Sequence, residues 1–301
     1  MLPTRTSRAL FGALTTLALL ATACGGGATA AGGSGATSTA SAQLKVEPQN
    51  STLLVGENRL GIALLQADKP LLDAVATVAV RSGGRTLETE KLEFAGHEYH
   101  DIPYYLSAVS FPAQGVYHLV VDATPASGPP ASGAVDVEVT TKSPEPPVGF
   151  TMPALKQPIT SDVNGDLTRI DSGVPPDQWH SETVAEGLAQ HRPMVVYFGQ
   201  PGRCATETCG PTVTVLQELC KQYCTKLLFE HVEVHYPASA DATNPAFAQM
   251  GFQSEPWTYF VNAQGVIADR FEGPVTLAQL QAAADGTLAG RVPAVDISVS
   301  S

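Results

Sequence analysis

The stretch VVYFGQPGRCATETCGPTVTVLQEL, residues 195–219, joins two periodic patterns through a loop that holds two cysteines. The apolar run at 193–199 predicts a buried strand. The apolar positions at Val213, Leu216 and Leu219 have the spacing of one helix face. Strand, cysteine loop and helix therefore follow one another directly, and Cys209 falls at the predicted start of the helix.

A cysteine at a helix start faces unpaired N–H groups and the positive end of the helix dipole, which favours the thiolate. Cys209 precedes Gly210 and Pro211. Pro211 suits the first helical turn because it has no N–H to leave unpaired. Arg203, next to Cys204, is a further candidate to stabilise a thiolate.

Four of the five cysteines lie within residues 204–224. An even set in an exported chain predicts two disulfides, and four cysteines allow three pairings. We favour Cys204–Cys209 together with Cys220–Cys224. The first bridge requires a loop at residues 205–208, since a straight helix would hold the Cα atoms too far apart. The second requires the helix to end near Tyr223, because helical neighbours four apart have their Cβ atoms too distant for a disulfide.

Together with SEPWTYFVNAQGVIADRFEG (residues 254–273), the opening stretch resembles the thioredoxin superfamily over about residues 183–288. The resemblance implies an α/β fold, a cis peptide bond before Pro256, and a substrate groove shaped by Pro256 and Pro211. The sequence departs from the family at Thr212, which stands where the second cysteine of the redox motif is expected. Cys204 lies five residues before Cys209 instead, a spacing that is also similar to the peroxiredoxin-Q group.

The N-terminal residues predict export. Arg5 and Arg8 precede a 15-residue apolar run that is too short to span a bilayer. The run ends in ATAC, residues 21–24, which resembles a bacterial lipobox and implies lipid attachment to Cys24. Residues 1–24 are thus expected to be a lipoprotein signal peptide and residues 25–42 a flexible tether. The expected location is the extracytoplasmic face of the cell membrane, a disulfide-permissive environment.

The composition argues against nucleic acid as a partner. The chain has 17 Lys+Arg against 29 Asp+Glu, a formal net charge of −12, and no basic run. Nucleic-acid affinity depends on phosphate neutralisation by basic residues. The absence of a basic run also argues against electrostatic binding to anionic lipids, so the lipid on Cys24 is the expected attachment to the membrane.

The rest of the chain predicts a multi-domain fold. Residues 43–141 contain about seven short strand patterns separated by turns, which predict an all-β immunoglobulin-like sandwich without a disulfide. Within it, GVYHLVVDA (residues 115–123) fits a strand buried on both faces. A Pro-rich linker at 142–175, an α/β thioredoxin-like domain at 176–290 and a tail at 291–301 complete the prediction.

No metal or other cofactor is predicted. His97 and His100 fit a polar loop, and DVNGDLTRIDSG (residues 162–173) lacks the glycine and the final acid of a calcium loop. Copper held by the cysteines and by histidines of the same domain, His180, His231 and His235, remains an alternative.

The expected function is thiol–disulfide exchange on exported proteins, or with a membrane redox partner. Cys209 is assigned as the attacking thiol and Cys204 as its resolver. Three alternatives remain open: a non-catalytic binding module with structural disulfides, a peroxiredoxin-Q-like peroxidase, and a copper-handling protein.

Overall fold

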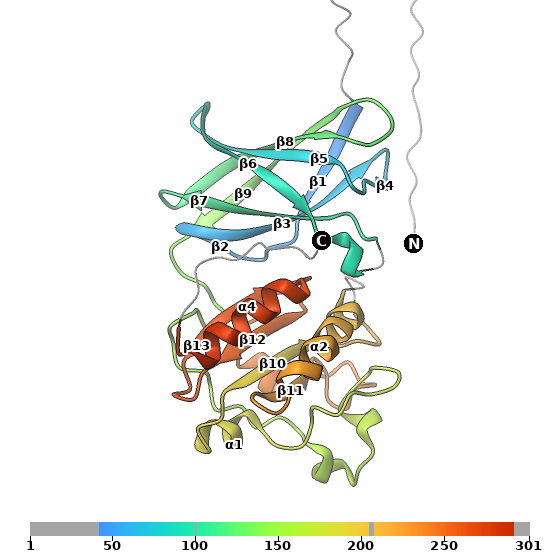
Figure 1. Ribbon diagram of the computed structural model, residues 1–301, viewed down its shortest axis with the longest axis vertical. Helices are drawn as coiled ribbons and strands as arrows, with labels where there is room; N and C mark the ends of the chain where they lie inside the picture. The colour runs from blue at the N-terminus through green and yellow to red at the C-terminus, as the bar shows by residue number, and fades with distance from the viewer. Residues whose placement is uncertain (1–41, 100, 205–207, 292–301) are drawn as a thin grey trace, which may run out of the picture. The chain divides into compact units, whose positions relative to one another are not determined.

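The computed structural model describes residues 42–99, 101–204 and 208–291, all within one compact unit of the chain (Figure 1). The predicted signal peptide with Cys24, nearly all of the tether, His100 and residues 292–301 of the tail lie outside the described residues. Among the described residues, no helix is both long enough and apolar enough to cross a bilayer.

The first hundred described residues are all-β, as predicted. Their strands are β1 (Ala42–Pro48), β2 (Leu53–Leu54), β3 (Gly56–Gln66), β4 (Lys69–Pro70), β5 (Val75–Ser82), β6 (Arg85–Phe94), β7 (Tyr104–Phe111), β8 (Gly115–Thr124) and β9 (Ala131–Thr140). In β8 the side chains alternate between the core and the surface: Leu119 and Val121 are buried, while Val116 is 65% exposed. The expectation that this strand is buried on both faces is therefore wrong.

These nine strands form one sheet that closes on itself: eight follow the order β1-β3-β7-β6-β5-β8-β9-β2, and β4 pairs with β3 outside this order. β1 pairs antiparallel with β3 and also parallel with β9. β6 pairs along its length with β5, and its last two residues pair with β7. β1 and β6 each pair with strands of both halves of this sheet, so the two layers of the immunoglobulin-like β fold are continuous at these strands.

The remaining elements surround a four-stranded sheet with the order β11-β10-β12-β13. β11 runs parallel to β10, and β12 and β13 are antiparallel. The strands are β10 (Met194–Gly199), β11 (Leu228–Glu233), β12 (Trp257–Val261) and β13 (Ile267–Glu272). The helices are α1 (Val184–Ala189), α2 (Cys209–Tyr223), α3 (Pro245–Ala248) and α4 (Leu277–Leu288), with 3-10 helices η1 (Gly96–Tyr99), η2 (Thr160–Val163) and η3 (Leu167–Arg169).

Alternate side chains of β10 enter two different cores. Val195 and Tyr197 pack with apolar residues of α2 and α4. Met194, Val196 and Phe198 pack with residues of α1 and α3. The strand is buried along its whole length, as its apolar sequence predicted. It ends directly at the cysteine loop.

The predicted fold class, an immunoglobulin-like sandwich followed by an α/β thioredoxin-like fold, is corrected by this structure. The described chain is mostly β, with thirteen strands against four α-helices. Among the helices, α1 has six residues and α3 is a single turn of four. Nearby backbone explains why both stay short: His191 has a positive φ before Pro193, and Gly251 has a positive φ after α3.

Tyr99, the last residue of η1, packs into the core that β10 shares with α2 and α4. Its side chain is buried among residues of α2 and α4. Its hydroxyl donates to the Val275 carbonyl over 2.5 Å and accepts from the Val275 N–H over 2.6 Å. A residue of the β-rich N-terminal part thus completes the core behind α2.

Candidate functional site

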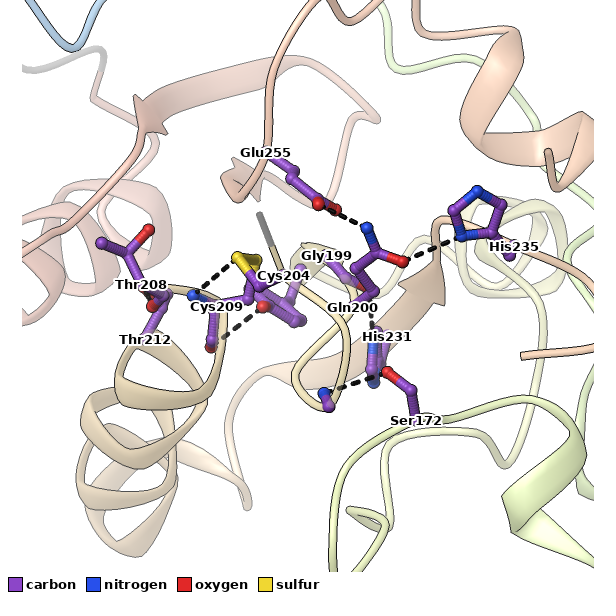
Figure 2. The surroundings of a disulfide bond; sticks show 12 residues. Ser172, Gly199, Gln200, Cys204, Thr208, Cys209, Thr212, His231, His235 and Glu255 are labelled. Carbon is purple, nitrogen blue, oxygen red and sulfur yellow. Dashed lines mark hydrogen bonds between the residues drawn. A yellow bond between two sulfur atoms is a disulfide. The ribbon is translucent and has the colours of Figure 1, made fainter. Parts of the chain in front are cut away.

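Both predicted disulfides are present. Cys204 and Cys209 are bonded with their Cα atoms 5.8 Å apart (Figure 2). Cys220 and Cys224 are bonded with theirs 4.7 Å apart. α2 ends at Tyr223, so the second bridge lies at the end of the helix, where the geometry requires it. Residues 205–207 are outside the described part of the chain.

The first bridge lies where β10 passes into α2. Two hydroxyl groups hold the start of this helix: Tyr197 donates to the Cys209 carbonyl over 3.0 Å, and Thr212 donates to the Thr208 carbonyl over 2.8 Å. Both side chains are buried. Thr212, which replaces the expected second cysteine, is therefore part of the support for the first turn of α2. Pro211 lies in this same turn, as predicted.

The two sulfur atoms differ in their surroundings. Cys209 is fully buried, whereas Cys204 is partly exposed. The backbone N–H of Cys209 donates to the Cys204 sulfur over 3.2 Å. This N–H belongs to the first residue of α2, where amides lack helical partners and the helix dipole is positive. The helix start is therefore directed at the sulfur of Cys204.

A carboxylate lies beside this disulfide. One oxygen of Glu255 lies within 4.8 Å of the sulfur atoms of both Cys204 and Cys209. Gln200 fixes it by donating from Nε2 to Glu255 Oε1 over 2.5 Å, and Nδ1 of His235 lies 2.8 Å from Gln200 Oε1 (Figure 2). The peptide bond between Glu255 and Pro256 is cis, as predicted. The sequence identified Pro256 but not this row of polar side chains.

Arg203 does not contact the sulfur of Cys204 as the sequence suggested. Its guanidinium donates to the carbonyls of Ala238 and Ala240 and to the carboxylate of Asp241, the last over 2.6 Å. These groups lie in the segment that follows β11. Arg203 therefore holds the cysteine loop against that segment.

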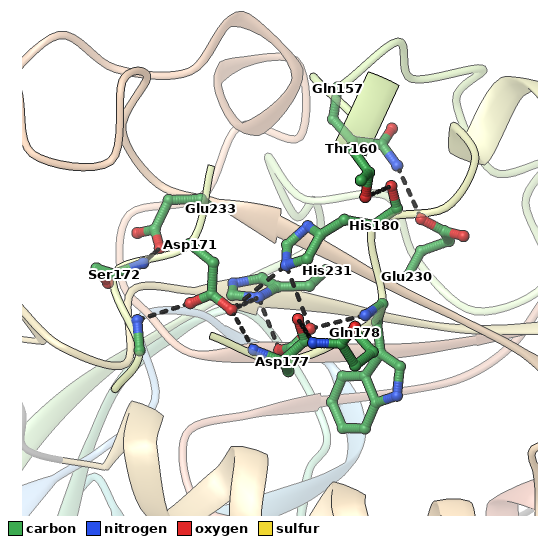
Figure 3. Close-up of polar contacts among 12 residues, drawn as sticks. Gln157, Thr160, Asp171, Ser172, Asp177, Gln178, His180, Glu230, His231 and Glu233 are labelled. Atoms are coloured by element: carbon green, nitrogen blue, oxygen red, sulfur yellow. Dashed lines mark hydrogen bonds and ion pairs between the residues drawn. The ribbon is translucent and has the colours of Figure 1, made fainter. Parts of the chain in front are cut away.

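His180 and His231 come together, but with carboxylates rather than with cysteines (Figure 3). Asp171 and Asp177 complete this buried group, which the sequence analysis missed because the two aspartates lie in a predicted linker and at the edge of a predicted domain. His235 is elsewhere, beside Gln200. The copper alternative counted these three histidines as possible ligands beside the cysteines, and none of them joins the cysteines in a group of ligand atoms in the described part of the chain.

The pKa values within this group are strongly shifted. Burial alone would favour the neutral carboxyl, but hydrogen bonds with His180 and His231 outweigh it and lower the pKa of Asp171. For His231, burial favours the neutral ring, but the charges of Asp177 and Asp171 and their hydrogen bonds raise its pKa well above the usual value. Both shifts favour the charged forms of these buried side chains.

Comparisons with known proteins place the chain in no family. No family model matches it, and no curated protein sequence matches it. Among solved structures it is similar to a DUF4426 family protein from Pseudomonas aeruginosa PAO1, with 15% identity and a TM-score of 0.26, over 33% of this chain and 91% of that one. It is also similar to fibronectin(III)-like modules of Clostridium thermocellum CbhA, with 15% identity and a TM-score of 0.20, over 33% of this chain and 99% of the other. The lipoprotein signal and the resemblance to the thioredoxin superfamily stay predictions.

The Glu255 carboxylate and the helix start act on the cysteine thiols in opposite directions. A negative charge this close disfavours a thiolate, whereas the amide of Cys209 favours one. In reduced protein, Glu255→Gln should therefore raise the thiolate fraction and speed alkylation by iodoacetamide at pH 6 by about tenfold, the effect of a charge interaction of roughly 1.4 kcal/mol. Mass spectrometry of timed samples measures the rate.

Glu218→Gln is the matched control, because Glu218 is an exposed carboxylate of α2 that pairs with Lys221. Its alkylation rate should equal that of the parent protein. Equal rates for Glu255→Gln and the parent would show that the Glu255 charge does not act on the thiols.

Proposed function

We propose that the protein carries out thiol–disulfide exchange through Cys204 and Cys209. The observation that carries the proposal is the contact between the first amide of α2 and the sulfur of Cys204, a partly exposed residue. Such an amide stabilises a thiolate, and exchange proceeds by thiolate attack. The Cys220–Cys224 pair lies at the other end of α2 and has no helix start directed at it.

The proposed roles of the two cysteines are the reverse of those expected from the sequence. Attack on a client disulfide requires a sulfur that the client can reach. Cys209 has 0% exposure, whereas Cys204 is partly exposed. The sequence pointed to Cys209 because it starts the helix, but the helix-start amide acts on the neighbouring sulfur. Cys204 therefore attacks, and Cys209 resolves.

The reaction starts from the reduced pair. The Cys204 thiolate attacks one sulfur of a client disulfide, and the second client sulfur leaves as a thiolate that takes up a proton. The Cys209 thiol loses its proton, and its sulfur then attacks the Cys204 sulfur. This step forms the Cys204–Cys209 disulfide and releases the first client sulfur. The client disulfide gains two electrons, which the cysteine pair loses, and the reverse sequence oxidises a client dithiol.

A pair of single variants tests these roles. In Cys209→Ser, Cys204 can attack but nothing resolves the product, so mixed disulfides should accumulate on Cys204. In Cys204→Ser, the remaining sulfur is buried and few should form. The probe is oxidised glutathione, added to each reduced variant, and mass spectrometry identifies the adducts. Diagonal gels of cell-envelope extracts detect mixed disulfides with cellular proteins.

The control carries Cys220→Ser and Cys224→Ser together with Cys209→Ser, and its adduct at Cys204 should be unchanged. Adducts that form mainly in Cys204→Ser would reverse the roles. Absence of adducts from both single variants would contradict exchange and favour a structural bridge. Oxidation of Cys204 by hydrogen peroxide that outpaces the glutathione reaction would favour a peroxidase instead.

We further propose that the protein acts at the extracytoplasmic face of the cell membrane, held there by lipid on Cys24. The lipobox-like ATAC at residues 21–24 supports this. An exported location also supplies the clients, since disulfides form and persist outside the cytoplasm. Exported proteins or a membrane redox partner are the corresponding partners.

The anchor is tested by Cys24→Ser in the full precursor. The variant should leave the membrane fraction or remain as an uncleaved precursor, as measured by fractionation and by mass spectrometry of the N-terminus. Cys220→Ser is the control, since it also removes one thiol but not the lipid acceptor. A Cys24→Ser protein that fractionates and migrates like its parent would contradict the anchor.

A further inference from the structure

The buried group of Asp171, Asp177, His180 and His231 has the form of a metal centre (Figure 3). His231 comes from β11, and the other three precede α1. Their side chains are at most 3% exposed. We propose that these four residues bind one zinc ion.

The distances between the ligand atoms fit a tetrahedral ion. Nε2 of His180 lies 3.4 Å from Asp171 Oδ2 and 3.2 Å from Asp177 Oδ1. Nδ1 of His231 lies 3.7 Å from Asp171 Oδ2 and 2.9 Å from Asp177 Oδ2. With nitrogen and oxygen ligands about 2.0–2.1 Å from zinc, tetrahedral geometry separates the ligand atoms by about 3.3 Å. The four separations lie between 2.9 and 3.7 Å, on both sides of this value, with Asp177 facing His180 through Oδ1 and His231 through Oδ2.

A backbone carbonyl outside the four residues also supports a metal site. The second ring nitrogen of His231, Nε2, lies 3.1 Å from the carbonyl oxygen of Gly199 at the end of β10. A histidine that binds a metal through one nitrogen commonly donates its other N–H to a backbone carbonyl, which fixes the ring. Gly199 provides that acceptor.

Hydrogen bonds within the chain do not account for every polar atom of the group. Both nitrogens of His231 face oxygen atoms, of Asp177 and Gly199. Nδ1 of His180, by contrast, is buried and has no hydrogen-bond partner in the described part of the chain.

Two buried carboxylates that face two imidazole rings favour a cation between them, because an unbalanced buried charge is costly. A divalent cation would balance the charges of the two carboxylates. Zinc fits because imidazole and carboxylate are among its usual ligands and four protein ligands close the site. Such a closed site is structural rather than catalytic.

The site lies behind the cysteine loop. The ring of His231 is 4.9 Å from that of Tyr197, whose hydroxyl holds the Cys209 carbonyl. Gly199 directly precedes Gln200, which positions Glu255. The ion would therefore stabilise the end of β10 that carries the proposed exchange site, although its binding does not depend on exchange activity.

The test uses the full chain with both disulfides intact, stripped of metal by a chelator. Titration with zinc should give one ion per chain by native mass spectrometry and raise the melting temperature. Cobalt(II) should give the intense visible absorption of tetrahedral coordination. If the parent protein binds neither zinc nor cobalt(II), the proposal is wrong, and no variant is needed to show it.

Two variants locate the ion. His180→Asn should weaken zinc binding at least tenfold, while His118→Asn should leave it unchanged. His118 is the matched control because it forms an exposed pair with Asp136, with 2.7 Å between nitrogen and oxygen. Equal zinc affinity in the parent protein and in a folded His180→Asn variant would place the ion elsewhere and contradict the proposal.

Discussion

The hydrogen bond from the Cys209 amide to the Cys204 sulfur is the contact on which the account of this protein depends. It exists because α2 begins at Cys209, so the first amide of the helix is free of helical partners. The buried strand β10 delivers the chain to this point, and the hydroxyl groups of Tyr197 and Thr212 hold the first turn. If the helix began one turn later, the same cysteines would be an ordinary structural bridge.

Local sequence signals predicted the features that depend on neighbouring residues. The two disulfides, the end of α2 near Tyr223 and the cis bond before Pro256 follow from short spacings and from one motif. The closure of the nine-stranded sheet was not predictable in this way, because it depends on β1 pairing with β9, more than 80 residues away.

The sequence predicted the cysteines of the candidate site but not the residues that surround them. Arg203 is adjacent to Cys204 in sequence, yet the loop at Ala238–Asp241 binds its guanidinium. Conversely, Glu255 lies far from Cys204 in sequence and close to it in space. Asp171 and His231 are 60 residues apart, and neither belongs to a motif with ligand spacing. Which cysteine is exposed is likewise a property of tertiary packing, which explains the reversal of the proposed roles.

The reduction potential of the Cys204–Cys209 disulfide shows directly whether this pair is an exchange site. The oxidised protein is equilibrated with defined ratios of reduced and oxidised dithiothreitol, the free thiols are alkylated, and each cysteine pair is quantified by peptide mass spectrometry. Cys220–Cys224 serves as the internal reference in every sample. Structural disulfides of exported proteins lie below about −300 mV, so an exchange site should show a Cys204–Cys209 potential above that value and above that of Cys220–Cys224. A Cys204–Cys209 potential below about −300 mV, or one equal to that of the reference pair, would contradict the claim that this is an exchange site.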